Sequence, residues 1–159
     1  EVIRKKNILQ KELGIKLLNK GHNIFLEGTP EKEFVALEVL RAINTGFSVD
    51  RALELKKEDF IFQIISIKDI TKRSDLGRIK GRVIGTKGKT LKTLQNLTNC
   101  DLAINNNEIG IIGSVEEMAD AIQSVTSLVQ GSKQGNVYAR LEKQRKKKNE
   151  DYFNKDINP

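Results

Sequence analysis

The stretch Val83-Ile84-Gly85-Thr86-Lys87-Gly88-Lys89-Thr90-Leu91 carries more information about the fold than any other part of this 159-residue chain. Its two glycines, three positions apart, allow a tight turn because glycine adopts backbone conformations that other residues avoid. Such a turn exposes backbone N–H groups at the start of the next helix, where partial positive charge favours a phosphate. The stretch therefore predicts a phosphate-facing turn between two helices.

The charges around this turn are all positive. Residues 76–99 hold six cations and no acidic residue, whereas residues 100–136 have a net charge of −4 and residues 137–159 a net charge of +3. A solvated helix ordinarily mixes both signs, so this block indicates an anion-facing surface; the alternative is a basic surface helix without a ligand. The cations are Arg78, Lys80, Arg82, Lys87, Lys89 and Lys92.

Hydrophobic spacing predicts the elements on either side of the turn. The order is strand, helix, helix, strand, strand, helix. In sequence these are a strand over 60–67, helices over 74–84 and 89–97, strands over 101–104 and 108–112, and a long helix from Ser114 to Val129.

The first half of the chain repeats the later part of this order at an offset of 85 residues. Leu9-Gln10 matches Leu94-Gln95, and Leu17 matches Leu102. A period of this length indicates duplicated domains and not a solenoid. The first copy begins too late to contain the initial strand and helix, so we expect either a missing N-terminal segment, which we favour, or a naturally reduced unit.

A helix is predicted to begin after Thr29 and to end at Gly46. Thr29 is a candidate N-cap and Pro30 suits the first turn. The helical spacing of the large apolar residues favours an apolar face that carries Phe34, Leu37, Leu40 and Ile43.

A GxxG turn between two basic amphipathic helices, after a strand and before a hairpin, is typical of a KH domain, which binds about four nucleotides of single-stranded nucleic acid. The predicted fold is α+β, with two type I KH-like units (β-α-α-β-β-α, a three-stranded sheet packed by three helices), the first incomplete at its N-terminus. We expect the first unit and a short linking helix in residues 1–57, the second unit in residues 58–142 and a basic C-terminal tail in residues 143–159.

Other classes of function are disfavoured. A Walker A loop requires GxxxxGK[ST], but Gly85 lies only three residues before Gly88. A dinucleotide fingerprint requires GxGxxG directly after a strand, but a helix is predicted before this turn. One Cys and one His exclude a disulfide framework and a Cys-based zinc cluster, and disfavour a Cys–His pair. We therefore expect no enzyme activity, metal or cofactor. The longest apolar stretch, Phe60–Ile67, is too short to span a bilayer, so we expect no membrane partner.

The run Arg78–Thr90 resembles the KH signature of the partner-of-Nob-one family, also called Dim-two, and of its KRR-one relatives. The resemblance continues through 97–101 and 111–113, and residues 128–142 are similar to the family's C-terminal segment. The short length resembles archaeal members.

This resemblance implies a cytoplasmic, non-enzymatic assembly factor that binds single-stranded RNA near the 3′ end of the small-subunit rRNA. It implies as partners the Nob-one-type endonuclease and the pre-small-subunit particle. The alternative is an RNA-binding or protein-scaffold module in another RNA-processing complex, such as the exosome.

The residues assign roles within the expected site. Gly85 and Gly88 shape the turn, and Thr86 and Lys87 present it to phosphate. The resemblance implies a groove between the helices and the second strand, with Ile84 and residues 102–104 as its apolar floor, although Ile84 and Ile104 could equally be core. The expected RNA-binding residues are Arg78, Lys80, Arg82, Ile84, Gly85, Thr86, Lys87, Gly88, Lys89, Lys92 and Ile104.

Two features of the C-terminal part leave alternatives open. Arg145–Lys148 either extends a helix that contacts RNA or forms a charged terminus. Tyr138 either belongs to the family's functional segment or packs the last helix against the sheet.

Overall fold

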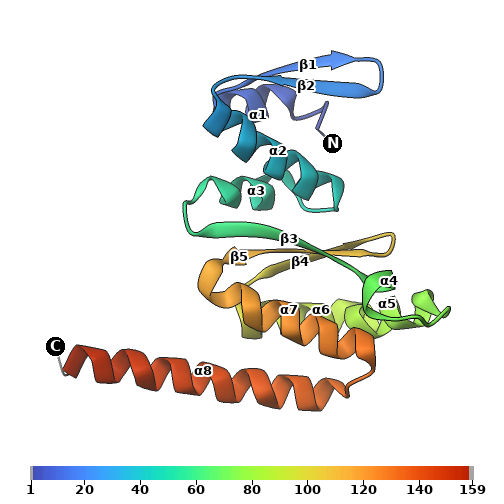
Figure 1. Ribbon diagram of the computed structural model, residues 1–159, viewed down its shortest axis with the longest axis vertical. Coiled ribbons are helices and arrows are strands. Elements are labelled where there is room, and N and C mark those ends of the chain that lie inside the picture. The colour runs from blue at the N-terminus through green and yellow to red at the C-terminus, as the bar shows by residue number, and fades with distance from the viewer. Residues whose placement is uncertain (1, 158–159) are drawn as a thin grey trace.

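A three-stranded antiparallel sheet lies at the centre of the computed structural model, which describes residues 2–157. Helices cover one face of this sheet, and the N-terminal part of the chain covers the other (Figure 1). The strands lie in the order β3-β5-β4, so the last strand in sequence is the central one. Their bounds are β3 Phe60–Ser66, β4 Asp101–Asn105 and β5 Glu108–Ser114.

The second unit has the predicted strand-helix-helix-strand-strand-helix order. Ile79 and Val83, one turn apart on the first of its helices, and Leu94 on the second are buried against the sheet, as their helical spacing predicts. A four-residue helix, α4, was not expected between the first strand and the first of these helices. The helices are α4 Ile67–Ile70, α5 Leu76–Ile84, α6 Lys89–Thr98 and α7 Val115–Gln130.

A 24-residue helix, α8 (Gln134–Ile157), follows α7 and includes Arg145–Lys148, for which a helix was one of the two predicted alternatives. It packs against α6 and α7 through the buried side chains of Val137 and Leu141, and then extends past the other helices (Figure 1). The helix runs without interruption through the expected start of the tail at residue 143. Tyr138, near the start of α8, is partly buried against the core that contains Val137 and Leu141.

The first unit repeats four consecutive elements of the second unit, α6, β4, β5 and α7, at the predicted offset of 85 residues. In β1–β2, Lys16 pairs with Glu27, and the equivalent pair in β4–β5 is Asp101 with Ile112. A side-chain hydrogen bond repeats as well: the Leu17 N–H donates to Oε1 of Gln10 at 2.7 Å, and the Leu102 N–H donates to Oε1 of Gln95 at 2.9 Å. The elements are α1 Lys6–Leu13, β1 Lys16–Lys20, β2 Asn23–Glu27 and α2 Pro30–Asn44.

The buried face of α2 differs from the prediction. Phe34 and Leu37 are 67% and 48% exposed, and the buried stripe consists of Ala36, Val39, Ala42 and Ile43. The spacing of the large apolar residues was right for Ile43 and for the partly buried Leu40, but wrong for Phe34 and Leu37. Two small alanines face the core in their place, because they allow close approach. Thr29 occupies the N-cap position but its side chain makes no capping hydrogen bond.

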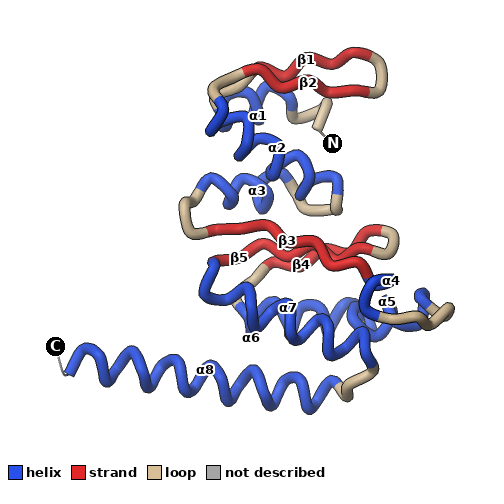
Figure 2. The backbone as a smooth tube through the Cα atoms, in the orientation of Figure 1, coloured by secondary structure: helices blue, strands red, loops and turns tan. Residues whose placement is uncertain are grey.

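Two hydrophobic cores share the central sheet. On β5, Ile111 belongs to the core under α5, α6 and α7, and the next residue, Ile112, belongs to the core formed with the first unit. On the second face the rings of Phe47 and Phe62 meet edge to face, 6.1 Å apart. Figure 2 shows α2 and the short helix α3 (Val49–Ala52) between the two sets of strands. The 3-10 helix η1 (Leu53–Lys56) follows α3 directly. We place the boundary between the units at residues 57–58, in the turn before β3, as a proposal.

Candidate nucleic-acid interface

The GxxG turn joins α5 to α6 through an unusual backbone path. Gly85 has φ 75° and ψ 173°, a combination accessible essentially only to glycine, and Gly88 has φ 72°. Lys87 also adopts a left-handed conformation, with φ 51° and ψ 33°. As a result Thr86 and Lys87 form an exposed tip at the start of α6. The positive end of α6 and the side chain of Lys87 therefore meet at one accessible point.

The turn is held in place by the first residue of α8. Nε2 of Gln134 donates to Oγ1 of Thr90 at 2.9 Å and to the carbonyl oxygen of Arg82 at 3.1 Å. Thr90 is buried and packs directly against Gly85, where a Cβ atom would lie 2.7 Å from the Thr90 backbone nitrogen. The long-range contact from α8 thus fixes the residues on both sides of the turn.

Helix geometry divides the predicted cations between two faces. Successive helical residues are about 100° apart, so Arg78 and Arg82 share one edge of α5, and Lys80 and Ile84 share the opposite edge. The Arg78–Arg82 edge lies toward α8, where Nη2 of Arg82 donates to the Ser132 carbonyl oxygen at 2.7 Å. The single block of charge in the sequence is therefore two separate surfaces in the structure.

Four of the expected RNA-binding residues, Lys80, Ile84, Lys92 and Ile104, do not line the α8-side cavity described below, and we call them the strand-side face. Ile84 is 36% exposed at the end of α5, so it is available to a ligand. Lys92 is exposed one turn before Gln95, whose side chain binds the backbone of β4. Ile104 is partly buried against the helix-side core, and Leu102 is fully within it. Of the proposed apolar floor, Leu102 is core and Ile84 remains the accessible position.

On the opposite face lies the α8-side pocket, a cavity of 670 Å³ between α5, α6 and the start of α8. It combines three cations, three threonines, one amide and one aromatic ring. Among the described residues, none that lines it is acidic. Its lining residues are Arg78, Gly81, Arg82, Gly85, Thr86, Lys89, Thr90, Thr93, Gln134 and Tyr138.

Five of the lining residues are predicted RNA-binding residues, but the pocket itself was not predicted; they are Arg78, Arg82, Gly85, Thr86 and Lys89. Gln134 and Tyr138 come from α8, 46 and 50 residues after Gly88 along the chain. The quoted C-terminal segment of the family resemblance contains Tyr138, but nothing in the local pattern indicates what it faces.

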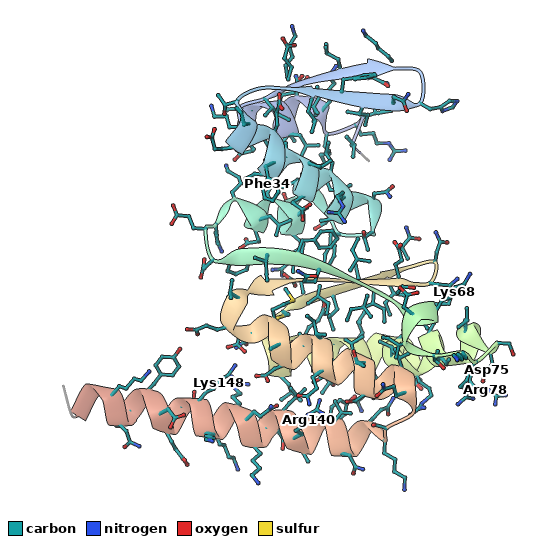
Figure 3. All side chains as sticks on the ribbon, viewed as in Figure 1. Phe34, Lys68, Asp75, Arg78, Arg140 and Lys148 are labelled. Carbon is teal, nitrogen blue, oxygen red and sulfur yellow. The ribbon has the colours of Figure 1, made fainter. Side chains whose placement is uncertain are left out.

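The basic run Arg145–Lys148 does not form a single RNA-facing surface. Nζ of Lys148 lies 2.9 Å from Oδ2 of Asp120 and 3.1 Å from Oε2 of Glu117, both on α7. Figure 3 shows Lys148 on the side of α8 that faces the other helices. Arg140 also contacts α7, since its Nη2 donates to Oγ of Ser124 at 3.1 Å. Lys148 therefore helps attach α8 to α7, whereas Lys146 and Lys147 are exposed.

Cys100 is a core residue, in agreement with its sequence position before a strand. It is buried in the helix-side core, and burial raises the pKa of its thiol to about 11. Within residues 2–157, no three His, Cys, Asp or Glu side chains are grouped as metal ligands would be. In the same part of the chain, no helix combines the length and apolar character needed to cross a bilayer.

The sheet order, the helix order and the GxxG turn together define a type I KH domain. The family model of the second KH domain of PNO1, described as a eukaryotic-type KH domain (KH-domain type I), matches residues 61–146. The chain belongs to the PNO1/Dim2 family of KH proteins.

Two curated relatives show how far the similarity extends. KH domain-containing protein MJ0443 of Methanocaldococcus jannaschii is 30% identical over 149 residues, which cover 89% of this chain and 66% of that protein. RNA-binding protein pno1 of Drosophila melanogaster is 33% identical over 138 residues, which cover 82% and 58%. The chain thus spans less than two thirds of the length of these relatives.

Solved structures share the whole arrangement. A protein of unknown function from Aeropyrum pernix has a TM-score of 0.86 at 27% identity, covering 98% of this chain and 88% of that one. Dim2p from Pyrococcus horikoshii OT3 has a TM-score of 0.82 at 27% identity, covering 90% and 89%. A second structure from that organism, an a/eIF2alpha-aDim2p-rRNA complex, has a TM-score of 0.83 at 26% identity, covering 91% and 84%.

Proposed function

We propose that this chain is a non-enzymatic RNA-binding factor of ribosomal RNA processing, and that it binds single-stranded RNA through the GxxG turn and the strand-side face. The observation that carries the proposal is the exposed Thr86–Lys87 tip within an acid-free block of six cations. Family membership supports it, since relatives are named as RNA-binding and pre-rRNA-processing proteins and one structural neighbour is a complex with rRNA.

The finer form of the proposal places the bound RNA near the 3′ end of the small-subunit rRNA, within a pre-small-subunit particle in the cytoplasm. The backbone N–H groups at the start of α6 receive a phosphate, and Lys87 and Lys89 supply charge beside it. Bases lie over Ile84 on the strand-side face. Since the residues that define this face include no aromatic ring, base selection there depends on hydrogen bonds to base edges and on fit.

Changing both tip residues to aspartate, Thr86→Asp with Lys87→Asp, is expected to lower the affinity for single-stranded RNA at least tenfold. The change places two negative charges where a phosphate binds and removes one cation. Because both side chains are exposed, the circular dichroism spectrum and the unfolding midpoint should stay as in the unmodified chain. Fluorescence anisotropy with a labelled 15-nucleotide RNA of random sequence measures the affinity.

The chain offers a matched control in a second Thr-Lys pair, Thr71-Lys72, which precedes α5. Thr71→Asp with Lys72→Asp makes the same change in net charge away from the turn, and we expect it to lower RNA affinity less than threefold. An unaltered affinity in the tip variant, or equal losses in both variants, would refute specific recognition by the GxxG turn.

We also propose a protein-binding role for the first unit, with the Nob-one-type endonuclease as the partner. Residues 1–57 contain no GxxG turn, yet Phe25, Phe34 and Leu37 expose 49%, 67% and 48% of their surfaces. Figure 3 shows Phe34 on α2, remote from Arg78 near the start of α5. Exposed aromatic and aliphatic side chains gathered on one unit are typical of a protein interface.

Replacing Phe34 and Leu37 with serine is expected to weaken binding of the purified endonuclease at least tenfold in a calorimetric titration, while RNA affinity stays unchanged. The variant Thr86→Asp with Lys87→Asp should instead bind the endonuclease normally and lose affinity for RNA. If the serine variant bound the endonuclease normally, the exposed residues of α2 would not be its docking surface.

A further inference from the structure

We infer that the α8-side pocket is a second RNA site, which holds a nucleotide of the same strand after that strand has passed the GxxG turn. This inference rests on the proposed function and adds to it a face of the domain that lies opposite the strand-side face. The ligand class is a phosphate-bearing nucleotide with an accessible base and ribose.

The charges around the pocket indicate an anion. Arg78, Arg82 and Lys89 converge on it, and among the described residues Arg78 and Lys89 form no ion pair. By contrast, the neighbouring Arg73 is paired with Asp75 at 2.7 Å. Three cations around a cavity in which no described lining residue is acidic favour the binding of an anion there.

The remaining lining residues fit the other parts of a nucleotide. Tyr138 offers an aromatic ring on which a base can stack, which the strand-side face lacks. The hydroxyl group of Thr86 can donate to a phosphate. The hydroxyl group of Thr93 donates to the Lys89 carbonyl oxygen at 2.9 Å and can still accept from a ribose 2′-OH. Cations, hydroxyl groups and one ring in the same cavity match a nucleotide better than an acidic peptide, which would use the cations alone.

The position of the pocket connects it to the proposed RNA path. Gly85 and Thr86 belong both to the GxxG turn and to the pocket lining, so the two sites adjoin at the tip. Gln134 fixes this junction through its hydrogen bonds to Thr90 and Arg82. A strand that binds the start of α6 can therefore continue around the tip into the pocket, and a fragment of a few nucleotides would occupy only the first site.

The test compares a short RNA with a longer one. In the pocket variant, Arg78→Gln with Tyr138→Leu, the bulk of both side chains is kept and the charge and aromatic ring are removed. We expect it to lower the affinity for a labelled 15-nucleotide random RNA about tenfold and to leave a 5-nucleotide random RNA unaffected. The slope of log affinity against log salt for the 15-nucleotide RNA should fall by about 0.7, the effect of one phosphate contact in a single strand.

The matched control makes the same two changes elsewhere, Arg51→Gln with Tyr152→Leu, at residues of the first unit and of the distal part of α8. It should bind both RNAs like the unmodified chain. If the pocket variant behaves like this control while the unmodified chain binds both RNAs, the inference is overturned and the proposed function stands. If the unmodified chain binds neither RNA, both are overturned.

Photo-crosslinking gives a direct second measurement on the unmodified chain. A 15-nucleotide RNA containing 4-thiouridine is expected to label the tryptic peptide of residues 134–140, which carries Gln134 and Tyr138. Labelling confined to residues 83–104 would overturn the second site. The second RNA site would also be overturned if the pocket variant lost affinity for a polyglutamate peptide and kept its affinity for the 15-nucleotide RNA. The pocket would then bind an acidic protein segment.

Discussion

Replacing either Ile111 or Ile112 with alanine is expected to lower the free energy of unfolding by about 2–5 kcal/mol, although the two side chains project into different cores. Both are fully buried on the central strand β5. Ile111 packs in the core beneath α5–α7, and Ile112 in the core shared with the first unit, together with Phe62 and Val39. In each case the loss of three carbon atoms leaves a cavity that surrounding close-packed side chains fill only in part.

The same experiment tests whether the two units unfold together. The chain has two tyrosines, Tyr138 and Tyr152, and no tryptophan, so tyrosine fluorescence reports on α8, whereas far-ultraviolet circular dichroism reports on the whole chain. Because both cores share β5, we expect the two signals to change at one urea concentration in both variants. Val115→Ala, at a position 60% exposed at the start of α7, serves as the control and should alter stability by less than about 0.5 kcal/mol. A dichroism change that precedes the fluorescence change in Ile112→Ala would show that the first unit unfolds independently.

The parts of the fold that sequence reasoning predicted are those with local patterns. Ile79, Val83 and Leu94 recur at helical spacing, and these positions are buried in the structure. The repeat at an offset of 85 residues can also be recognised without knowledge of tertiary contacts, since it depends only on like residues at like positions. It holds even for the side-chain contacts of Gln10 and Gln95 with the following strand.

The parts that it missed depend on tertiary contacts. α8 is highly charged, and its attachment relies on two buried apolar residues, Val137 and Leu141, and on the ion pairs of Lys148 with α7. None of these contacts is visible in a local window of sequence. For the same reason the sequence did not predict which edge of α5 lies toward α8. The surface that carries Arg78 and Arg82 was therefore not distinguished from the one that carries Lys80. In α2, the exposure of Phe34 and Leu37 shows that large apolar residues need not define the buried face.

Replacing Gly85 with alanine is expected to affect both stability and RNA binding. The backbone angles of Gly85 lie in a region that costs other residues about 1–3 kcal/mol, so the free energy of unfolding should fall by at least that amount. In addition, the new Cβ would lie 2.7 Å from the backbone nitrogen of Thr90, so the start of α6 must shift. Thr90 also accepts the hydrogen bond from Gln134, and the shift would therefore reach α8 and the pocket. We expect RNA affinity to fall at least tenfold, because both proposed contact regions meet at this residue.

Gly77→Ala, at the opposite end of the helix that Gly85 follows, is the matched control. A Cβ at Gly77 would meet no atom within 4 Å, and the residue lies inside α5 with no positive φ. Alanine is the better helix former, so this variant should keep RNA affinity and gain up to about 1 kcal/mol of stability. Urea unfolding and anisotropy with the 15-nucleotide RNA measure the two quantities for both variants. If Gly85→Ala retained the stability of the unmodified chain, the turn would follow a backbone path that tolerates a side chain. In that case the contact between Gly85 and Thr90 would not fix the start of α6.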